Sequence, residues 1–226
     1  MKVLIVCTNY DTYPSKKAKT GIWLNELTHF YEVMSRKRLL IDIMSPFGGS
    51  IPVDKRSLES KDEINTKYLT NTDFLNKKNH SLSPNEIEPD DYRLIYFVGG
   101  PGAMWDFPNN NQITQIAGTI YKNGGMITAV GHGVAALLNI ETNNGKSFLE
   151  DKYVTGFSNL EEKLMSFISE SPFSLEDALK EKGAHFTKSM IPFIEFIEMD
   201  ERLITGQNAN SAKKIAIKAI EELFEK

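Results

Sequence analysis

The chain has 226 residues, of which 41% are hydrophobic and 25% are charged, and its formal net charge at pH 7 is -4. A chain of this length and balance can bury the core of one compact α/β domain, and its weak negative charge argues against a nucleic-acid partner. No apolar run is long enough to span a membrane, and the short run at residues 1–7 predicts a strand rather than a signal peptide.

Cysteine and histidine usage limits the kinds of site that we expect. The only cysteine, Cys7, cannot form a disulfide within the chain, which favours a reducing, cytoplasmic location. The four histidines are scattered without the spacing of a metal-ligand motif. We therefore expect neither a metal ion nor another cofactor.

The first half of the chain predicts the start of a parallel sheet. Residues 2–8 form an apolar run, residues 9–19 are polar, and residues 39–44 form a second apolar run. Residues 21–36 lie between them and carry apolar side chains at helical spacing. Those side chains are Trp23, Leu24, Leu27, Tyr31 and Met34. The pattern is typical of a β-α-β unit with a right-handed crossover.

Residues 45–91 are the least regular part of the chain. Proline and glycine at positions 46, 48, 49 and 52 indicate a loop, and two or three short polar helices are expected after it. We expect this segment to lie over one edge of the sheet as a cap or an interface. We expect it to belong to a single domain, residues 1–226, and to expose apolar surface between its short helices.

The second half predicts further strands and helices around a glycine-rich turn. A strand at 93–98 ends in Gly99-Gly100-Pro101-Gly102, which is not a dinucleotide fingerprint because the glycine spacing is wrong and no helix is expected directly after it. A helix at 109–122 then precedes a strand at 126–130. The remaining predicted elements are strands at 152–157, 183–187, 193–198 and 202–205, and helices at 174–182 and 211–224.

The stretch from Met126 to Leu138 is the most informative part of the sequence. An almost wholly apolar strand ends at Val130, Gly131-His132-Gly133 forms a tight turn, and a helix is expected from Val134. A strand–turn–helix unit of this kind lifts one side chain above the sheet and points the free amides of the helix toward it. Here the lifted position, Gly131, has no side chain.

This stretch resembles the Ala-x-Cys-His-Gly elbow of the ThiJ/PfpI superfamily, the class I glutamine amidotransferase-like proteins. The resemblance runs from the first strand to the last helix and points to the branch of glutathione-independent glyoxalases and heat-shock-type stress chaperones. The other matching blocks, in the family's order, are Thr20–Glu26, Ser45–Gly49, Val98–Gly102, Thr155–Glu162 and Leu203–Asn208.

The resemblance implies a fold and a set of partners. The implied fold is a flavodoxin-like three-layer α/β sandwich with a mostly parallel central sheet, assembled as a homodimer. The implied ligand is a small carbonyl or carboxylate compound, and unfolded client proteins are possible partners. The implied enzyme class is a glyoxalase III-like lyase, also described as a D-lactate dehydratase.

The resemblance also implies the residues of the site. In the family the elbow cysteine attacks an aldehyde, an acid from the first helix bonds to its sulfur, and a second acid orients the elbow histidine. Glu26, His132 and Glu162 occupy the matching positions, whereas Gly131 leaves the position of the nucleophile empty. A covalent step through a thiolate therefore cannot run at Gly131.

A second departure stands at Pro101, where this branch of the family usually has histidine. Proline also lacks a backbone donor, but the amide of Gly100 remains and can form half of an oxyanion hole beside the amide of Gly131. Together, the two departures favour natural degeneration over a single introduced mutation.

Each candidate residue also has a structural interpretation. Glu26 could be an exposed glutamate of an amphipathic helix, and His132 could be a structural histidine. Ser158-x-x-Glu161 is typical of a capping box, so that Glu162 either orients His132 or faces solvent. Cys7 is either a core residue or a substitute nucleophile.

Three functions follow from these observations. The first is a degenerate glyoxalase-type protein that lacks the nucleophile and keeps a small-molecule pocket or a holdase role. The second is a non-covalent lyase or hydratase that uses Glu26 and His132. The third is an active glyoxalase or deglycase from which the elbow cysteine has been removed by mutation.

Overall fold

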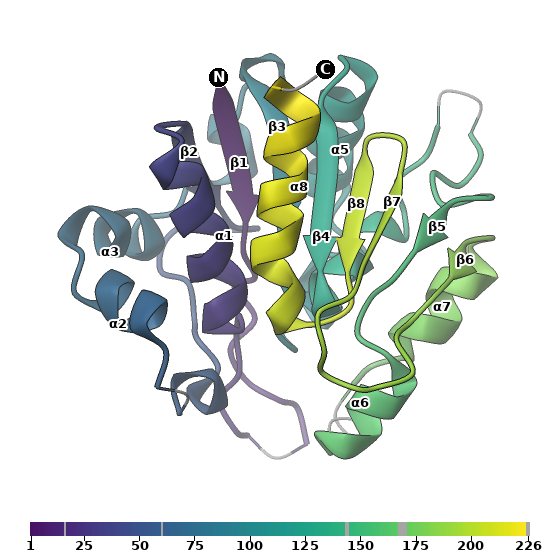
Figure 1. Cartoon of the computed structure of the whole chain (residues 1–226), viewed down its shortest axis with the longest axis horizontal. Coiled ribbons are helices and arrows are strands. Elements are labelled where there is room, and N and C mark those ends of the chain that lie inside the picture. Colours follow the sequence, from purple (N-terminus) through teal and green to yellow (C-terminus); the bar gives the residue numbers. More distant parts are fainter. Residues whose placement is uncertain (16, 60, 143–144, 167–170, 225–226) are drawn as a thin grey trace.

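A six-stranded sheet forms the centre of the fold in the computed structural model, which describes residues 1–15, 17–59, 61–142, 145–166 and 171–224 (Figure 1). Its strands are β1 (Lys2–Val6), β2 (Leu40–Met44), β3 (Tyr92–Phe97), β4 (Met126–Val130), β7 (Ile197–Asp200) and β8 (Leu203–Gly206). Their order is β2-β1-β3-β4-β8-β7, and only β7 pairs antiparallel. A separate parallel pair consists of β5 (Tyr153–Val154) and β6 (His185–Phe186).

Helices cover both faces of this sheet. The longest are α1 (Leu24–Arg36), α5 (Asn111–Lys122) and α8 (Ala212–Phe224). In Figure 1, α1 and α8 lie in front of the sheet and α5 lies behind it. Alternate residues of β1 divide between two apolar clusters: Val3 and Ile5 pack with residues of α1 and α8, while Leu4 and Val6 pack with residues of α5. This confirms the flavodoxin-like three-layer arrangement.

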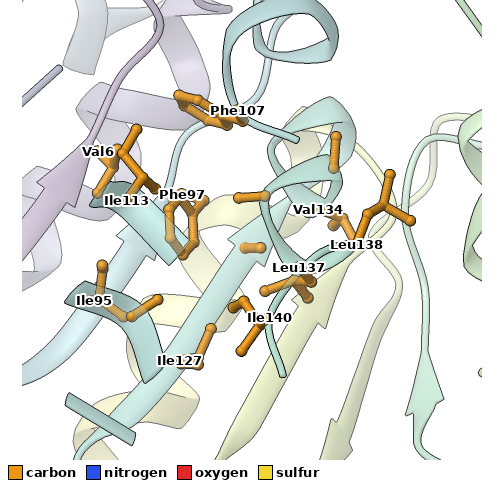
Figure 2. Close-up of a cluster of buried hydrophobic side chains, with 14 of the residues drawn as sticks. Val6, Ile95, Phe97, Phe107, Ile113, Ile127, Val134, Leu137, Leu138 and Ile140 are labelled. Carbon is orange, nitrogen blue, oxygen red and sulfur yellow. The ribbon is translucent and has the colours of Figure 1, made fainter. Parts of the chain in front are cut away.

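The two clusters are closely packed and anchor the strand ends that carry the site. On the α1 side, the rings of Phe30 and Tyr96 stack at a centroid distance of 3.6 Å. Figure 2 shows the other cluster, in which Leu137, just after the predicted elbow, lies next to Ile140 in one apolar group with Phe97 of β3 and Ile127 of β4. The elbow is therefore held by buried apolar contacts.

The irregular segment 45–91 lies beside α1 and the β2 edge of the sheet. It contains α2 (Glu63–Leu69), α3 (Thr72–Asn79) and 3-10 turns at Lys55–Leu58, Pro84–Glu86 and Pro89–Asp91. Its aromatic side chains Tyr68 and Phe74 are buried against Tyr31 of α1. Within the described part of this segment, the large apolar side chains that remain exposed are Phe47, Leu58 and Leu69. The segment therefore exposes these three apolar side chains and buries Tyr68 and Phe74 against α1.

Two predictions about local structure are wrong. A short helix, α4 (Ala103–Asp106), opens directly after the glycine-rich turn, because Gly100 and Pro101 accept hydrogen bonds from Ala103 and Met104. The elbow is itself the start of a 3-10 helix, Gly131–Leu137, which takes the place of an α-helix beginning at Val134. Its tighter winding keeps four small residues and the buried His132 close to the sheet.

The region after residue 150 also differs from the prediction. The strands expected at 152–157 and 183–187 shrink to two residues each, and the strand expected at 193–198 begins at Ile197. Pro192 cannot donate to a sheet ladder, and Phe193 has a positive φ of 60°, so this stretch runs outside the sheet. The helices here are α6 (Asn159–Leu164), which was not predicted, and α7 (Leu175–Glu181). No helix in the described part of the chain is long and apolar enough to cross a membrane.

Candidate active site

The carboxyl ends of β3, β4 and β8 meet at one edge of the sheet, where parallel strands usually present a ligand site. A cavity of about 240 Å³ lies there. Its walls come from the start of α1, the turn at residues 56–57, the loops after β3 and β8, and the elbow. The lining residues are Trp23, Asn25, Glu26, Arg56, Ser57, Gly100, His132, Phe157, Met165, Phe193, Asn208, Ala209 and Asn210.

Glu26 enters this cavity from the first turn of α1. The helix starts here because the preceding residues are extended: Ile22 pairs with Val53, and the amide of Trp23 donates to the carbonyl of Gly99 at 3.0 Å. Only 4% of Glu26 is exposed, and its Oε2 accepts no hydrogen bond from the described residues. The structure therefore places the carboxyl in the pocket, as the resemblance implied.

The environment of Glu26 determines its protonation. Burial raises the pKa of the Glu26 carboxyl well above its ordinary value, the nearby amide of Gly99 offsets only part of this effect, and the negative charge of Glu161 raises it further. Burial therefore favours the protonated carboxyl over the carboxylate. It can act as a hydrogen-bond donor or a general acid toward a ligand in the cavity.

Gly131 lies directly against this carboxyl. Its φ of 53° is in the left-handed region that residues with side chains rarely adopt. A Cβ added here would lie 3.0 Å from Oε1 of Glu26. The backbone thus keeps the geometry of an elbow that aims a side chain at Glu26, although no side chain is present.

His132 and Glu162 form a buried pair next to the elbow. Nε2 of His132 lies 2.8 Å from Oε1 of Glu162, and both residues are almost fully buried. The imidazole ring also contacts the ring of Phe157 at a centroid distance of 4.5 Å. Because a carboxylate can only accept, Nε2 donates this bond. Glu162 does not face solvent, and it is placed to orient the histidine.

The neighbouring Glu161 caps α6 and also ties two other walls of the cavity together. The capping box is confirmed, since Oε2 accepts from the amide and the hydroxyl of Ser158. Oε1 accepts from the amide of Phe193 at 2.8 Å and from Nδ2 of Asn208 at 2.8 Å. Glu161 is fully buried, so these four bonds replace its hydration. One carboxylate therefore fixes three segments that surround the ligand space.

We expect Glu161→Gln to destabilise the protein by about 1–3 kcal/mol, since the amide nitrogen cannot accept the bonds that one carboxylate oxygen accepted. The walls carrying Phe193 and Asn208 should also exchange amide hydrogens faster. Denaturant unfolding and hydrogen exchange measure the two effects. Glu150→Gln, at an exposed carboxylate paired with Lys146, is the control and should change neither. Unchanged exchange at residues 193 and 208 in Glu161→Gln would contradict this role.

The other candidate residues differ in whether they line the cavity. Gly100 lines the cavity, whereas Pro101 is buried and is not among the lining residues. Cys7 is also buried outside the lining set, and burial raises the pKa of its thiol, so it is a poor substitute nucleophile. Among the described residues, no three side chains of histidine, cysteine, aspartate or glutamate gather into a metal site.

Sequence reasoning missed much of the cavity wall. Asn208 and Phe157 lie in stretches that match the family, so their position in those blocks was a usable signal. Arg56 and Ser57 carried no such signal, because they lie in the irregular segment and only the tertiary structure brings them to the cavity. Phe193 follows a proline in a loop, where no periodic pattern indicates burial.

A model of the DJ-1/PfpI family matches residues 25–222. The chain belongs to the DJ-1/PfpI family. Among its relatives, the glutathione-independent glyoxalase HSP31 of Saccharomyces cerevisiae is 32% identical over 235 residues, which cover 98% of each protein. Glyoxalase 3 of Candida albicans is 29% identical over 231 residues, which cover 96% of this chain and 95% of that protein.

Solved structures of related proteins are similar to this DJ-1/PfpI family member over nearly the whole chain. The Rapid Encystment Protein 24 KDa of Francisella tularensis is 42% identical, with a TM-score of 0.95 and coverage of 99% of each chain. The glyoxalase III of Candida albicans is 26% identical, with a TM-score of 0.90 and coverage of 97% of this chain and 96% of that one. The resemblance inferred from the elbow and its neighbouring blocks is confirmed.

Proposed function

We propose that this protein binds a small carbonyl or carboxylate compound in the cavity without forming a covalent bond at Gly131. The observation that carries the proposal is the elbow itself. Its backbone keeps a φ of 53° and aims at Glu26, yet the nucleophile position is empty. Relatives at about 30% identity are named glutathione-independent glyoxalases, which makes small carbonyl compounds the ligand class to test first.

In this proposal two polar groups and the apolar walls of the cavity have roles in binding. The protonated Glu26 donates a hydrogen bond to a carbonyl or carboxylate oxygen, and the backbone around Gly100 offers a second donor. Phe157 and Trp23 contribute apolar surface to the walls, which excludes water and strengthens these hydrogen bonds.

A second candidate function is acid–base catalysis without a nucleophile. The observation that favours it is a carboxyl of raised pKa and a carboxylate-oriented imidazole lining one cavity. Such a pair suits the reversible hydration of an aldehyde. His132 would take a proton from water as the oxygen bonds to the carbonyl carbon, and Glu26 would give its proton to the carbonyl oxygen. The product is a gem-diol, with Glu26 left as a carboxylate and His132 as an imidazolium, and proton exchange with water restores the starting state.

The experiment combines a binding measurement with a turnover measurement. Glyoxylate and lactate should raise the melting temperature at millimolar concentration, because a ligand that binds only the folded state stabilises it. Methylglyoxal without glutathione should give no enzymatic D-lactate. Asn210→Trp should block the mouth of the cavity and abolish the shift, and Asn111→Trp, in a groove along α5, should not.

The two measurements separate the candidates. Turnover of methylglyoxal near the ordinary enzyme value of roughly ten per second would refute the loss of covalent chemistry. No thermal shift with either acid would refute the binding proposal. Exchange of labelled oxygen into the aldehyde, dependent on both Glu26 and His132, would favour the hydratase.

A further inference from the structure

Arg56 is the one lysine or arginine among the described residues that line the cavity. It comes from the irregular segment 45–91, which the sequence suggested to be a cap or an interface. The short 3-10 turn Lys55–Leu58 brings Arg56 and Ser57 to the cavity wall together. This segment therefore supplies the pocket with a permanent positive charge.

The guanidinium of Arg56 is held rigidly before any ligand arrives. The side chain of Asp54 accepts from Nε at 2.8 Å and from Nη2, and Tyr13 accepts from Nη2 at 2.7 Å. Asp54 is only 1% exposed and also accepts from the hydroxyl of Thr20. Since the side chain is already ordered, a ligand that meets it loses less binding energy to immobilisation.

Arg56 and Glu26 are placed by two chain segments that pair with each other. The amide of Ile22 donates to the carbonyl of Pro52 at 3.0 Å, and the amide of Asp54 donates to the carbonyl of Ile22 at 2.9 Å. Glu26 follows the first segment by one turn of helix, and Arg56 follows the second by two residues. The distance between the acid and the cation is therefore fixed by backbone hydrogen bonds.

We propose that Arg56 anchors the carboxylate of a 2-oxo acid whose carbonyl oxygen lies at Glu26. The proposal deepens the proposed function and rests on it, since it names the ligand class of the same cavity. A cavity of about 240 Å³ suits a small metabolite, and the side-chain amide of Asn25 can donate to a further oxygen of such an acid.

The charges around the cavity favour a carboxylate over a phosphate. Asp54 neutralises Arg56 in part, and the buried carboxylates Glu161 and Glu162 add negative charge from the α6 side. A dianion would be repelled by these carboxylates about twice as strongly as a monoanion, whereas the guanidinium can balance one negative charge on the ligand.

The test compares pyruvate with pyruvamide, which has nearly the same shape and no charge. Calorimetry should show that the protein binds pyruvate at least about tenfold more tightly at low salt, and that Arg56→Met removes this preference without weakening pyruvamide. Arg56→Lys should keep part of it. Arg36→Met is the matched control, since Arg36 is exposed at the end of α1, pairs with Glu32 and lies outside the cavity lining. This variant should leave both affinities unchanged.

The proposal can still be tested if Arg56→Met fails to fold, by a double variant and by a salt titration of the unaltered protein. Arg56→Met leaves Asp54 buried without its cation, so Arg56→Met combined with Asp54→Asn removes the unpaired charge as well. In the unaltered protein, added salt should weaken pyruvate binding and leave pyruvamide binding unchanged. Equal affinities for the two compounds, insensitive to Arg56 and salt, would overturn the anchor and leave the proposed function standing. Failure of both compounds to bind would overturn both proposals.

Discussion

Gly131→Cys should create a thiol that reacts rapidly with iodoacetamide at neutral pH, while Cys7 stays unreactive. The new Cβ would lie 3.0 Å from the Glu26 carboxyl, whose proton can be donated to a thiolate. We therefore expect the pKa of the introduced thiol to fall below the peptide value of about 8.5. The pH dependence of the alkylation rate measures it, and a titration near the peptide value would show that the site has decayed beyond its missing nucleophile.

Gly131→Ala separates the strain at this position from the chemistry of the thiol. A side chain with a φ of 53° costs roughly 1–3 kcal/mol, so both variants should unfold at lower denaturant concentration by a similar amount. Only the cysteine variant should gain any D-lactate formation from methylglyoxal. Adding Pro101→His should increase that activity above either single change. Activity restored to an ordinary level by Gly131→Cys alone would favour an active glyoxalase from which the cysteine had been removed.

Glu26→Gln should make the protein more stable at neutral pH and change how its stability depends on pH. Burial raises the pKa of Glu26 in the folded state, so the folded protein keeps a proton that the unfolded chain releases above about pH 4.3. The stability from this group is fully present below that unfolded pKa and is lost as the pH rises through the folded one. The slope is about 1.4 kcal/mol per pH unit. Urea denaturation between pH 4 and pH 8 measures it.

Glu32 on the same helix provides the opposite case as a control. Although burial raises the pKa of Glu32, hydrogen bonds from Lys67, Tyr68 and Arg36 lower it to about 2. Its contribution to stability is therefore present above the unfolded pKa and is lost as the pH falls toward 2. Glu32→Gln should destabilise the protein at neutral pH and matter little in acid. Identical pH profiles for the two variants would contradict the protonated state of Glu26.

The sequence was sufficient to predict the sheet and the elbow, because short-range patterns of apolar residues and glycines indicate both. Buried parallel strands are nearly continuous apolar runs, and the runs at residues 2–8, 93–98 and 126–130 all became central strands. Helical spacing predicted α1, α5 and α8. Glu26 stood out because it interrupts an apolar helix face, and the family's blocks supplied its role.

The rest of the site depends on contacts between distant segments, which leave no local pattern. Arg56 reaches the cavity because Ile22 pairs with Val53, and neither side of that bridge is periodic. Glu161 was predicted as a cap from its spacing to Ser158, but its bonds to Phe193 and Asn208 cross more than 30 residues of chain. The 3-10 winding after Gly131 follows from packing against the sheet and not from helix propensity.

The empty elbow also decides how the site responds to oxidants. A reactive elbow thiol is open to successive oxidation by peroxide, and its later products are irreversible. This site contains no sulfur at the position of the nucleophile, and Cys7 is fully buried. The elbow should therefore stay chemically unchanged through an oxidative burst that would damage a cysteine-bearing elbow, and Met165 is the oxidisable sulfur that remains among the described residues lining the cavity. The missing cysteine thus removes both the covalent chemistry of the elbow and its sensitivity to oxidation.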